Sequence, residues 1–205
     1  MKRNKIKCGS TQFCNCPTAR RARNEQLEYT FTYINENLNA IYYDIPKCAT
    51  TTIRTTFFKK NMSLISPSKK IKDYFKFTLC RNPYDRVVSN YTMFTKNKFR
   101  VNQIRQLHLN PENLSFSNFV KLISASDNHH WQPQFEFVRG YDINFIGKLE
   151  NFQEDFNIIC DKIGIPQQQL PHKNATKHKH YTEYYDDETK QIVAEKYAKD
   201  IEYFG

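Results

Sequence analysis

The chain has 205 residues, enough for one domain with a substantial buried core, and its five Gly and eight Pro exclude a collagen-like or low-complexity protein. The formal net charge of +10 indicates an anionic partner, such as a phosphorylated cofactor, a charged glycan, nucleic acid or a membrane surface. No run of about 18 apolar residues is present, and no apolar segment follows the basic start. The sequence therefore predicts no membrane span, no secretory signal and a cytoplasmic location.

The beginning of the chain differs in composition from the rest. Residues 1–26 are rich in Lys, Arg and Asn without an apolar period, which predicts a flexible basic arm, and residues 27–205 are predicted to form one domain. The arm's cysteines are not followed by a second ligand pair at zinc spacing, so no metal site is predicted. These cysteines are Cys8, Cys14 and Cys16. The remaining cysteines lie in apolar surroundings and are expected to be buried thiols: Cys48, Cys80 and Cys160.

Strands and helices are predicted to alternate along the domain. An edge strand is expected at residues 29–34 and a buried strand at residues 40–45. A helix with Thr50 as its N-cap is then expected to run to residue 60. A second buried strand is expected at residues 75–80.

Further elements follow the second buried strand. In chain order they are a helix that begins at Pro83, helices near residues 101–107 and 116–124, a strand at 143–146, a helix at 152–163 that ends at Gly164, and a last helix at 187–203. This alternation predicts an α/β fold with a central, mainly parallel sheet flanked by helices, in a P-loop-like three-layer arrangement.

The segment 44–54, Asp-Ile-Pro-Lys-Cys-Ala-Thr-Thr-Thr-Ile-Arg, joins the first buried strand to its helix. The backbone N–H groups and hydroxyls of a helix N-terminus suit an anion, and Lys47 can place its ammonium group on the same anion. The spelling differs from the G-x-x-x-x-G-K-[ST] loop, which disfavours an ordinary ATPase or kinase. Taken alone, the segment is also compatible with a capped helix that carries a solvated Lys and Arg.

The segment 81–91, Arg-Asn-Pro-Tyr-Asp-Arg-Val-Val-Ser-Asn-Tyr, follows the second buried strand. Ligands of open α/β sheets bind at the carboxyl ends of strands, so Arg81 and Ser89 could hold one phosphate by charge and hydroxyl. Arg86 could instead pair with a neighbouring carboxylate. A solvated helix face is the alternative interpretation of this segment.

Together, the two segments resemble the membrane-type carbohydrate sulfotransferases, the family of the chondroitin, dermatan and heparan O-sulfotransferases. The shared pattern is a strand followed by Pro-Lys-x-Ala-[Ser/Thr]-Thr and a helix, and then Arg-Asn-Pro-x-Asp-Arg-x-x-Ser. The resemblance implies that these segments bind the 5′-phosphosulfate and the 3′-phosphate of 3′-phosphoadenosine 5′-phosphosulfate (PAPS). The cofactor-binding residues that it implies are Lys47, Cys48, Ala49, Thr50, Thr51, Thr52 and Arg54, together with Arg81 and Ser89.

The resemblance continues more weakly to the end of the chain. It includes the His-Trp-Gln-Pro-Gln stretch that begins at His130, the strand at residues 141–147 with Glu150 after it, and the Tyr pair and terminal Phe-Gly of residues 184–205. The family's Golgi members carry a membrane anchor, and this sequence shows none. The implied acceptor is a glycan or another hydroxyl-bearing small molecule.

The implied reaction is an in-line transfer of a sulfuryl group, which depends mainly on positioning and electrostatics. Lys47 is expected to stabilise the leaving 5′-phosphate oxygen, and no metal is predicted. Some relatives place a histidine between the two segments, but residues 58–77 contain none. The general base is therefore predicted to be His130, with His129 and Asp127 beside it and Glu150 as a further option. Alternatively, His130 only packs beside Trp131.

Two other functions fit parts of the sequence. Residues 48–55 fit the C-x₅-R-[ST] loop of cysteine phosphatases, in which Cys48 would attack phosphorus and Arg54 would clamp its oxygens. That loop has no glycine here, and the phosphatase hypothesis leaves Arg81 unexplained. The net charge also suggests a non-enzymatic binder of nucleic acid or another polyanion, but no recognised nucleic-acid-binding signature is present, so nucleic acid is not the favoured partner.

Overall fold

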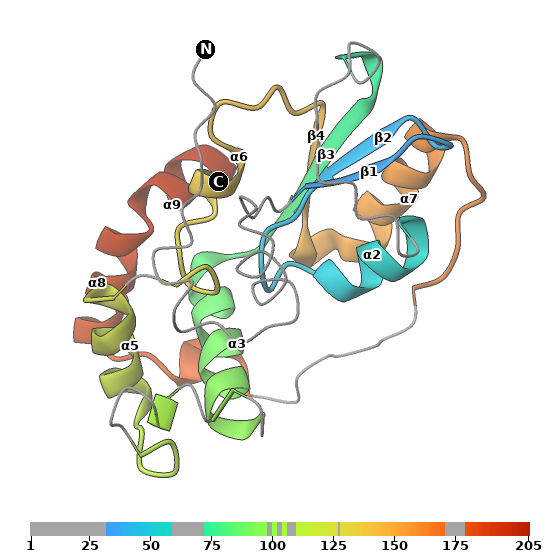
Figure 1. Cartoon of the computed structure of the whole chain (residues 1–205). Helices are drawn as coiled ribbons and strands as arrows, with labels where there is room; N and C mark the ends of the chain where they lie inside the picture. Colours follow the sequence, from blue (N-terminus) through green and yellow to red (C-terminus); the bar gives the residue numbers. More distant parts are fainter. Residues whose placement is uncertain are drawn as a thin grey trace, which may run out of the picture. The chain divides into compact units, whose positions relative to one another are not determined.

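The computed structural model describes residues 32–58, 72–97, 100–101, 104–105, 110–126, 128–170 and 179–205. Contacts between residues divide the chain into two compact units, which are described separately below (Figure 1). Among the described residues, the first unit comprises 32–82 and 134–170, and the second comprises 83–133 and 179–205. The predicted arm, residues 1–26, lies outside the described residues, and a single domain over residues 27–205 stays a prediction.

The first unit is built on a four-stranded sheet in the order β1-β2-β3-β4. β1 (Thr32–Asn35) is antiparallel to β2 (Ala40–Tyr43), whereas β2, β3 (Phe75–Cys80) and β4 (Phe145–Lys148) are parallel to one another. All four residues of β2 are buried, and β2 lies inside the sheet, between β1 and β3. The mainly parallel sheet confirms the predicted α/β fold.

Two helices of the first unit pack against the sheet and against each other. They are α2 (Thr50–Phe57), which follows β2, and α7 (Phe152–Ile163), which follows β4 (Figure 1). The ring of Phe57 stacks on Phe156 with centroids 4.9 Å apart and meets Phe77 of β3 edge-on at 6.4 Å. α7 has the predicted bounds and ends at Gly164, whose φ of 72° favours glycine. The short helices α6 (Phe135–Val138) and η2 (Leu149–Asn151) were not predicted.

The second unit is helical in its described residues. It contains α3 (Pro83–Lys96), α5 (Phe116–Ser124), η3 (Tyr181–Glu183), α8 (Asp187–Lys196) and α9 (Ala198–Phe204). The predicted start of α3 and both predicted bounds of α5 are confirmed. The core between the helices consists of buried apolar side chains: Val87, Val88, Phe94, Ile104, Leu114, Phe116, Phe119, Val120, Ile123, Trp131, Val193 and Tyr197. No helix in the described part of the chain is long and apolar enough to cross a membrane.

Three predicted element bounds in the first unit are wrong. The strand predicted at 40–45 ends at Tyr43, because the chain turns into a loop from Asp44. The N-cap of α2 is Ala49 rather than Thr50, so Thr50 is the first helical residue. β4 begins two residues later than predicted, at Phe145. Just before it, Asn144 binds both backbone groups of Lys76: its Oδ1 accepts from Lys76 N and its N–H donates to Lys76 O, both at 2.8 Å.

Other differences involve the ends of predicted elements. The predicted last helix is two helices, because Tyr197 leaves the helical conformation at φ −109° and ψ 23°. The edge strand expected at 29–34 is seen as β1, with residues 29–31 outside the described part. α2 ends at Phe57 rather than at residue 60, and residues 59–60 are not described. Of the helix predicted at 101–107, the described residues Val101, Ile104 and Arg105 are helical.

Candidate functional site

The carboxyl ends of the three parallel strands define one edge of the sheet in the first unit. Tyr43 of β2 pairs with Thr78 of β3, and Cys80 of β3 pairs with Lys148 of β4, so the segments that follow these strands lie next to one another. The backbone N–H of Asn82, after β3, donates to Glu150 Oε1, after β4, at 2.6 Å. Ligands of open α/β sheets bind at this edge.

The loop between β2 and α2 has an unusual backbone. Lys47 and Ala49 adopt left-handed conformations, with φ of 74° and 59°, and a turn bond from Cys48 N to Ile45 O at 3.1 Å lies between the strand and the helix. A left-handed conformation costs a residue other than glycine roughly 1–2 kcal/mol. Loops of this kind turn successive N–H groups into a concave anion-binding nest. Lys47 and Ala49 adopt these conformations without being glycine. The absence of glycine therefore does not exclude an anion-binding nest in this loop.

A buried carboxylate holds this loop in place. Asp44 is 3% exposed, and its Oδ1 accepts hydrogen bonds from Tyr42 Oη at 2.9 Å and from Thr50 Oγ1 at 2.6 Å. Burial, and then the charge of Asp44, raise the pKa of Tyr42 well above its ordinary value, so the phenol stays protonated and donates. Sequence reasoning missed Asp44 and placed it inside the strand predicted at residues 40–45, although a carboxylate in a buried run was a visible signal.

Helix α2 begins directly after this loop, at Thr50. No side chain among the described residues caps α2 at Ala49, so its first N–H groups are available to an anion in the way that helix N-termini usually are. The hydroxyl of Thr50 donates to Asp44, Thr51 is exposed, and Thr52 is buried. The helix therefore offers an anion mainly its backbone N–H groups and its dipole.

The structure does not support the phosphatase interpretation of Cys48. Its side chain is fully buried, and Sγ donates to Gln134 Oε1 at 3.2 Å. A nucleophilic cysteine has to reach its substrate. Cys80 is also buried, and burial is the main cause that raises its pKa to about 12, so it stays a neutral thiol. Cys48, Cys80 and Cys160 are buried and form no disulfide among the described residues, as predicted.

Arg81 lies directly after β3 and meets the loop that follows β2. The side-chain amide of Gln134 bridges its backbone: Oε1 accepts from Arg81 N at 2.9 Å, and Nε2 donates to Arg81 O at 2.8 Å. Arg81 Nη1 is 3.4 Å from the carbonyl oxygen of Lys47. The structure thus brings together one basic residue from each predicted segment. Arg54 lies elsewhere, with its guanidinium carbon 4.9 Å from the centroid of the Tyr33 ring in β1.

In the second unit, Arg86 organises the segment that carries the predicted base. It is 1% exposed and donates to Gln132 O at 2.8 Å and to His130 O at 3.1 Å. Asn90 Nδ2 donates to His130 O at 2.8 Å, and Tyr197 Oη donates to the next carbonyl, that of Trp131, at 2.6 Å. Helix α3 and the end of α8 thereby fix residues 130–132.

The histidines of this segment are packed into the second unit. His130 is 6% exposed, its Nδ1 is 2.8 Å from Asn128 Oδ1, and its ring meets Phe94 edge-on at 5.4 Å. The ring of His129 is 3.8 Å away. This is the packing arrangement that the alternative interpretation of His130 expected, and a role as general base stays a prediction. Asp127 lies outside the described residues.

Removing the buried cation of α3 should destabilise the second unit. We expect Arg86→Met to lower the free energy of unfolding by about 2–3 kcal/mol, because two carbonyl groups lose a charged donor while the apolar stem is kept. Chemical denaturation measures the change. Arg105→Met is the matched control, since that side chain is 56% exposed and should matter by less than about 0.5 kcal/mol. Equal effects of the two substitutions would contradict the role given to Arg86.

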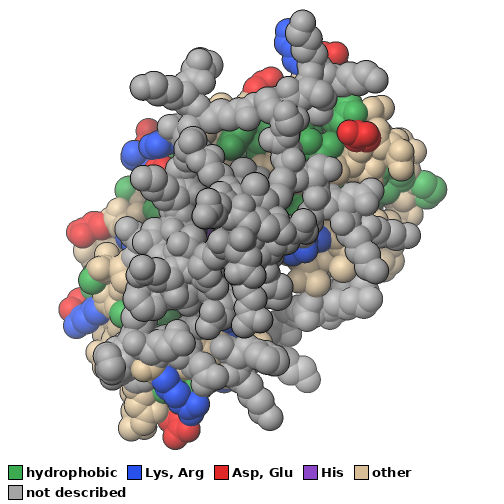
Figure 2. Space-filling model, viewed as in Figure 1, with side chains coloured by type: hydrophobic (Ala, Val, Ile, Leu, Met, Phe, Trp, Pro, Cys, Tyr) green, Lys and Arg blue, Asp and Glu red, His purple; other side chains and the backbone are tan. Residues whose placement is uncertain are grey.

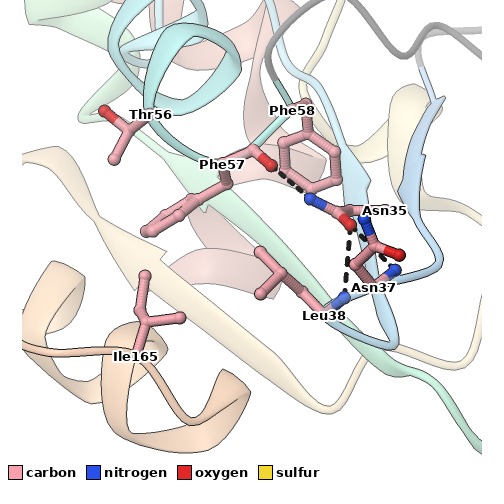
Figure 3. A pocket seen from close by; sticks show the side chains of 7 residues that line it. All are labelled: Asn35, Asn37, Leu38, Thr56, Phe57, Phe58 and Ile165. Carbon is pink, nitrogen blue, oxygen red and sulfur yellow. Dashed lines mark hydrogen bonds between the residues drawn. The ribbon is translucent and has the colours of Figure 1, made fainter.

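The depression in Figure 3 lies at the other end of the sheet. It has a volume of about 360 Å³ and is lined by Asn35, Asn37, Leu38, Thr56, Phe57, Phe58 and Ile165. Asn35 pairs with Ala40 at the start of β2, and its Nδ2 donates to Phe57 O at the C-terminal end of α2. Its lining contains no cation to hold an anionic ligand, so the candidate site is the edge with Lys47 and Arg81.

Part of the sequence matches a known protein family. A sequence model described as "Sulfotransferase family" matches residues 56–205, which contain Arg81 and Ser89 but begin after the loop that precedes α2. The described residues hold no group of three or more His, Cys, Asp or Glu that could bind a metal ion. The expectation that the reaction needs no metal stays a prediction.

Curated proteins with similar sequences include two carbohydrate sulfotransferases. Carbohydrate sulfotransferase 14 of Danio rerio is 25% identical over 122 residues, which cover 48% of this chain and 32% of that protein. Carbohydrate sulfotransferase 9 of Homo sapiens is 26% identical over 154 residues, 64% of this chain and 34% of that protein. The chain thus spans about a third of the length of these relatives. An uncharacterized protein of Archaeoglobus fulgidus is 34% identical over 103 residues, 49% of this chain and 77% of that protein. No solved structure matches the chain.

Proposed function

Because the chain belongs to the sulfotransferase family, we propose that it transfers the sulfuryl group of PAPS to a hydroxyl group of a carbohydrate. The observation that carries this proposal is the approach of Arg81 to the left-handed loop at Lys47, with Nη1 3.4 Å from the Lys47 carbonyl. A donor with two separate phosphate groups needs a basic residue at each phosphate. Lys47 can serve one phosphate and Arg81 the other.

The 5′ end of the donor is assigned to the loop and the start of α2. The N–H groups of the nest and of the first helical turn bind the 5′-phosphate, and Lys47 stabilises the charge that develops on it as the sulfuryl group leaves. The other implied members of this subsite are Cys48, Ala49, Thr50, Thr51 and Thr52. The N–H of Cys48 already donates to Ile45 O, so the backbone N–H groups of the other four would bind the anion. Arg54, which lies over Tyr33, would act on the donor only after leaving that ring.

The 3′-phosphate is assigned to Arg81, and to Ser89 by the sequence motif that the two residues share. Ser89 is buried on α3 of the second unit. The general base is assigned to His130 from the sequence alone, with Glu150 as the alternative. Glu150 is exposed at the strand edge, where its Oε1 accepts from Asn82 N.

The acceptor is proposed to be a glycan because three of the similar proteins are named carbohydrate sulfotransferases. The rival proposal, a simple polyanion binder, would favour an extended basic surface. On the face drawn in Figure 2, the Lys and Arg side chains of the described residues are scattered, and several lie beside Asp or Glu. Lys121 and Glu188, for example, form an ion pair at 2.8 Å.

The test is sulfuryl transfer from radiolabelled PAPS to a panel of acceptors: neutral oligosaccharides, uronic-acid-containing glycans, and phenolic and lipid alcohols. We expect label to enter glycans and the reaction to yield adenosine 3′,5′-bisphosphate in equal amount. Transfer only to phenols or lipids would overturn the acceptor class. Failure to use PAPS with every acceptor, together with failure to bind adenosine 3′,5′-bisphosphate, would overturn the proposed reaction.

A further inference from the structure

We propose that Gln134 is a positioning residue that selects donors carrying a 3′-phosphate, because its buried amide joins Arg81 to the loop at Cys48. The inference rests on the proposed function. Gln134 is completely buried in the first unit and comes from a part of the chain distant from both partners, 53 residues from Arg81 and 86 from Cys48.

The amide of Gln134 takes the place of a neighbouring strand at the point where the ladder of β3 ends. Arg81 is the first residue after β3, and both its backbone N–H and its C=O bond to this side chain, at 2.9 and 2.8 Å. The orientation of the amide is fixed by these partners, since the reverse orientation would set N–H against N–H and oxygen against oxygen. Both backbone groups of Arg81 are thereby held in place.

The same Oε1 atom also accepts the thiol hydrogen of Cys48 at 3.2 Å. Cys48 lies between the two left-handed residues of the loop, Lys47 and Ala49. One oxygen atom therefore links the segment assigned to the 5′-phosphate with the residue assigned to the 3′-phosphate. Because no part of this side chain is exposed, it acts on the donor only through these neighbours.

The backbone of Arg81 fixes where its side chain begins. With N and C=O fixed, the Cα–Cβ bond points one way, and the guanidinium reaches the carbonyl of Lys47. A cation held in advance loses little freedom when it binds a phosphate, which is the general advantage of preorganisation. Without the amide of Gln134, the Arg81 side chain becomes ordered only when the donor binds. The affinity contributed by the 3′-phosphate should then fall more than the affinity contributed by the rest of the nucleotide.

The test measures the ratio of the Kd values for adenosine 5′-phosphate and adenosine 3′,5′-bisphosphate. We expect Gln134→Leu to reduce this ratio about tenfold or more, toward the value for Arg81→Met. The double variant should have nearly the same ratio as Arg81→Met alone, because both substitutions act on the contact between Arg81 and the 3′-phosphate. If Gln134→Leu does not fold, Gln134→Asn serves, because its shorter amide cannot span all three partners.

The matched control is Gln153→Leu. Gln153 also bridges backbone groups with its amide, accepting from Leu170 N at 2.9 Å and donating to Gln168 O at 3.1 Å, but it lies on α7. It should lower stability without changing the ratio. An unchanged ratio in folded Gln134 variants, with wild type preferring the bisphosphate, would overturn this inference alone. A wild type without that preference would overturn the assignment of the 3′-phosphate in the proposed function.

Discussion

Replacing Lys47 by methionine is expected to lower kcat for sulfuryl transfer about 100- to 1,000-fold, the usual effect of removing one group that stabilises developing charge. Affinity for adenosine 3′,5′-bisphosphate should fall less, about tenfold, because the backbone N–H groups of the loop and of α2 remain. Methionine keeps the Cβ and the length of the stem, so the left-handed backbone at φ 74° is under the same strain in both proteins. Steady-state kinetics with PAPS and a glycan acceptor would measure both quantities.

The control for Lys47 is Lys76→Met. Lys76 lies on the same sheet, near the start of β3 and away from the carboxyl ends of the strands, and its Nζ donates to Lys72 O at 2.7 Å. This substitution should leave kcat within about twofold of wild type. If Lys47→Met kept kcat within the same range, Lys47 would not stabilise the leaving group.

Replacing Arg81 by methionine should weaken binding of adenosine 3′,5′-bisphosphate about 100-fold, as expected for the loss of charge-assisted hydrogen bonds to phosphate. Binding of adenosine 5′-phosphate should change by less than about threefold, because that nucleotide lacks the 3′-phosphate. The backbone bonds from Gln134 do not involve the guanidinium, so the loop should persist in the variant. Isothermal calorimetry with both nucleotides measures the difference.

Arg81→Lys refines this result. A lysine keeps the charge but lacks the planar fork of a guanidinium, so it should recover only part of the lost affinity. Arg139→Met is the surface control: Arg139 also belongs to the first unit, and its exposed side chain pairs with Glu136 at 3.4 Å. A loss of equal size for both nucleotides in Arg81→Met would mean that Arg81 supports the site as a whole rather than the 3′-phosphate.

Much of the fold could be predicted from local sequence. β3 has the predicted bounds because a run rich in apolar residues ends where Arg81 and Pro83 follow, and α7 ends at Gly164 because glycine readily adopts a left-handed conformation. At the last helix, a tertiary contact overrode the local pattern. Tyr197 interrupts the predicted last helix while its hydroxyl bonds to the carbonyl of Trp131, 66 residues away.

The candidate site was only partly visible in the sequence. The two candidate segments could be located in the sequence because each follows a buried strand. That they lie next to each other depends on the parallel pairing of β2 and β3. The carboxylate of Asp44 could have been noticed, since it lies within the first segment. The role of Gln134 could not, because its bonds to Arg81 and Cys48 span long stretches of chain that one sequence does not relate.

The most direct test of the central claim is calorimetric titration of the wild-type protein with adenosine 3′,5′-bisphosphate. We expect the bisphosphate to bind with a Kd of about 1–100 µM, which is typical of the affinity of enzymes for their substrates. Adenosine 5′-phosphate should bind at least tenfold more weakly. Lys47→Met and Arg81→Met should each weaken binding of the bisphosphate. No binding by wild type at millimolar nucleotide, or unchanged binding in both variants, would contradict the assignment of this strand edge as the donor site.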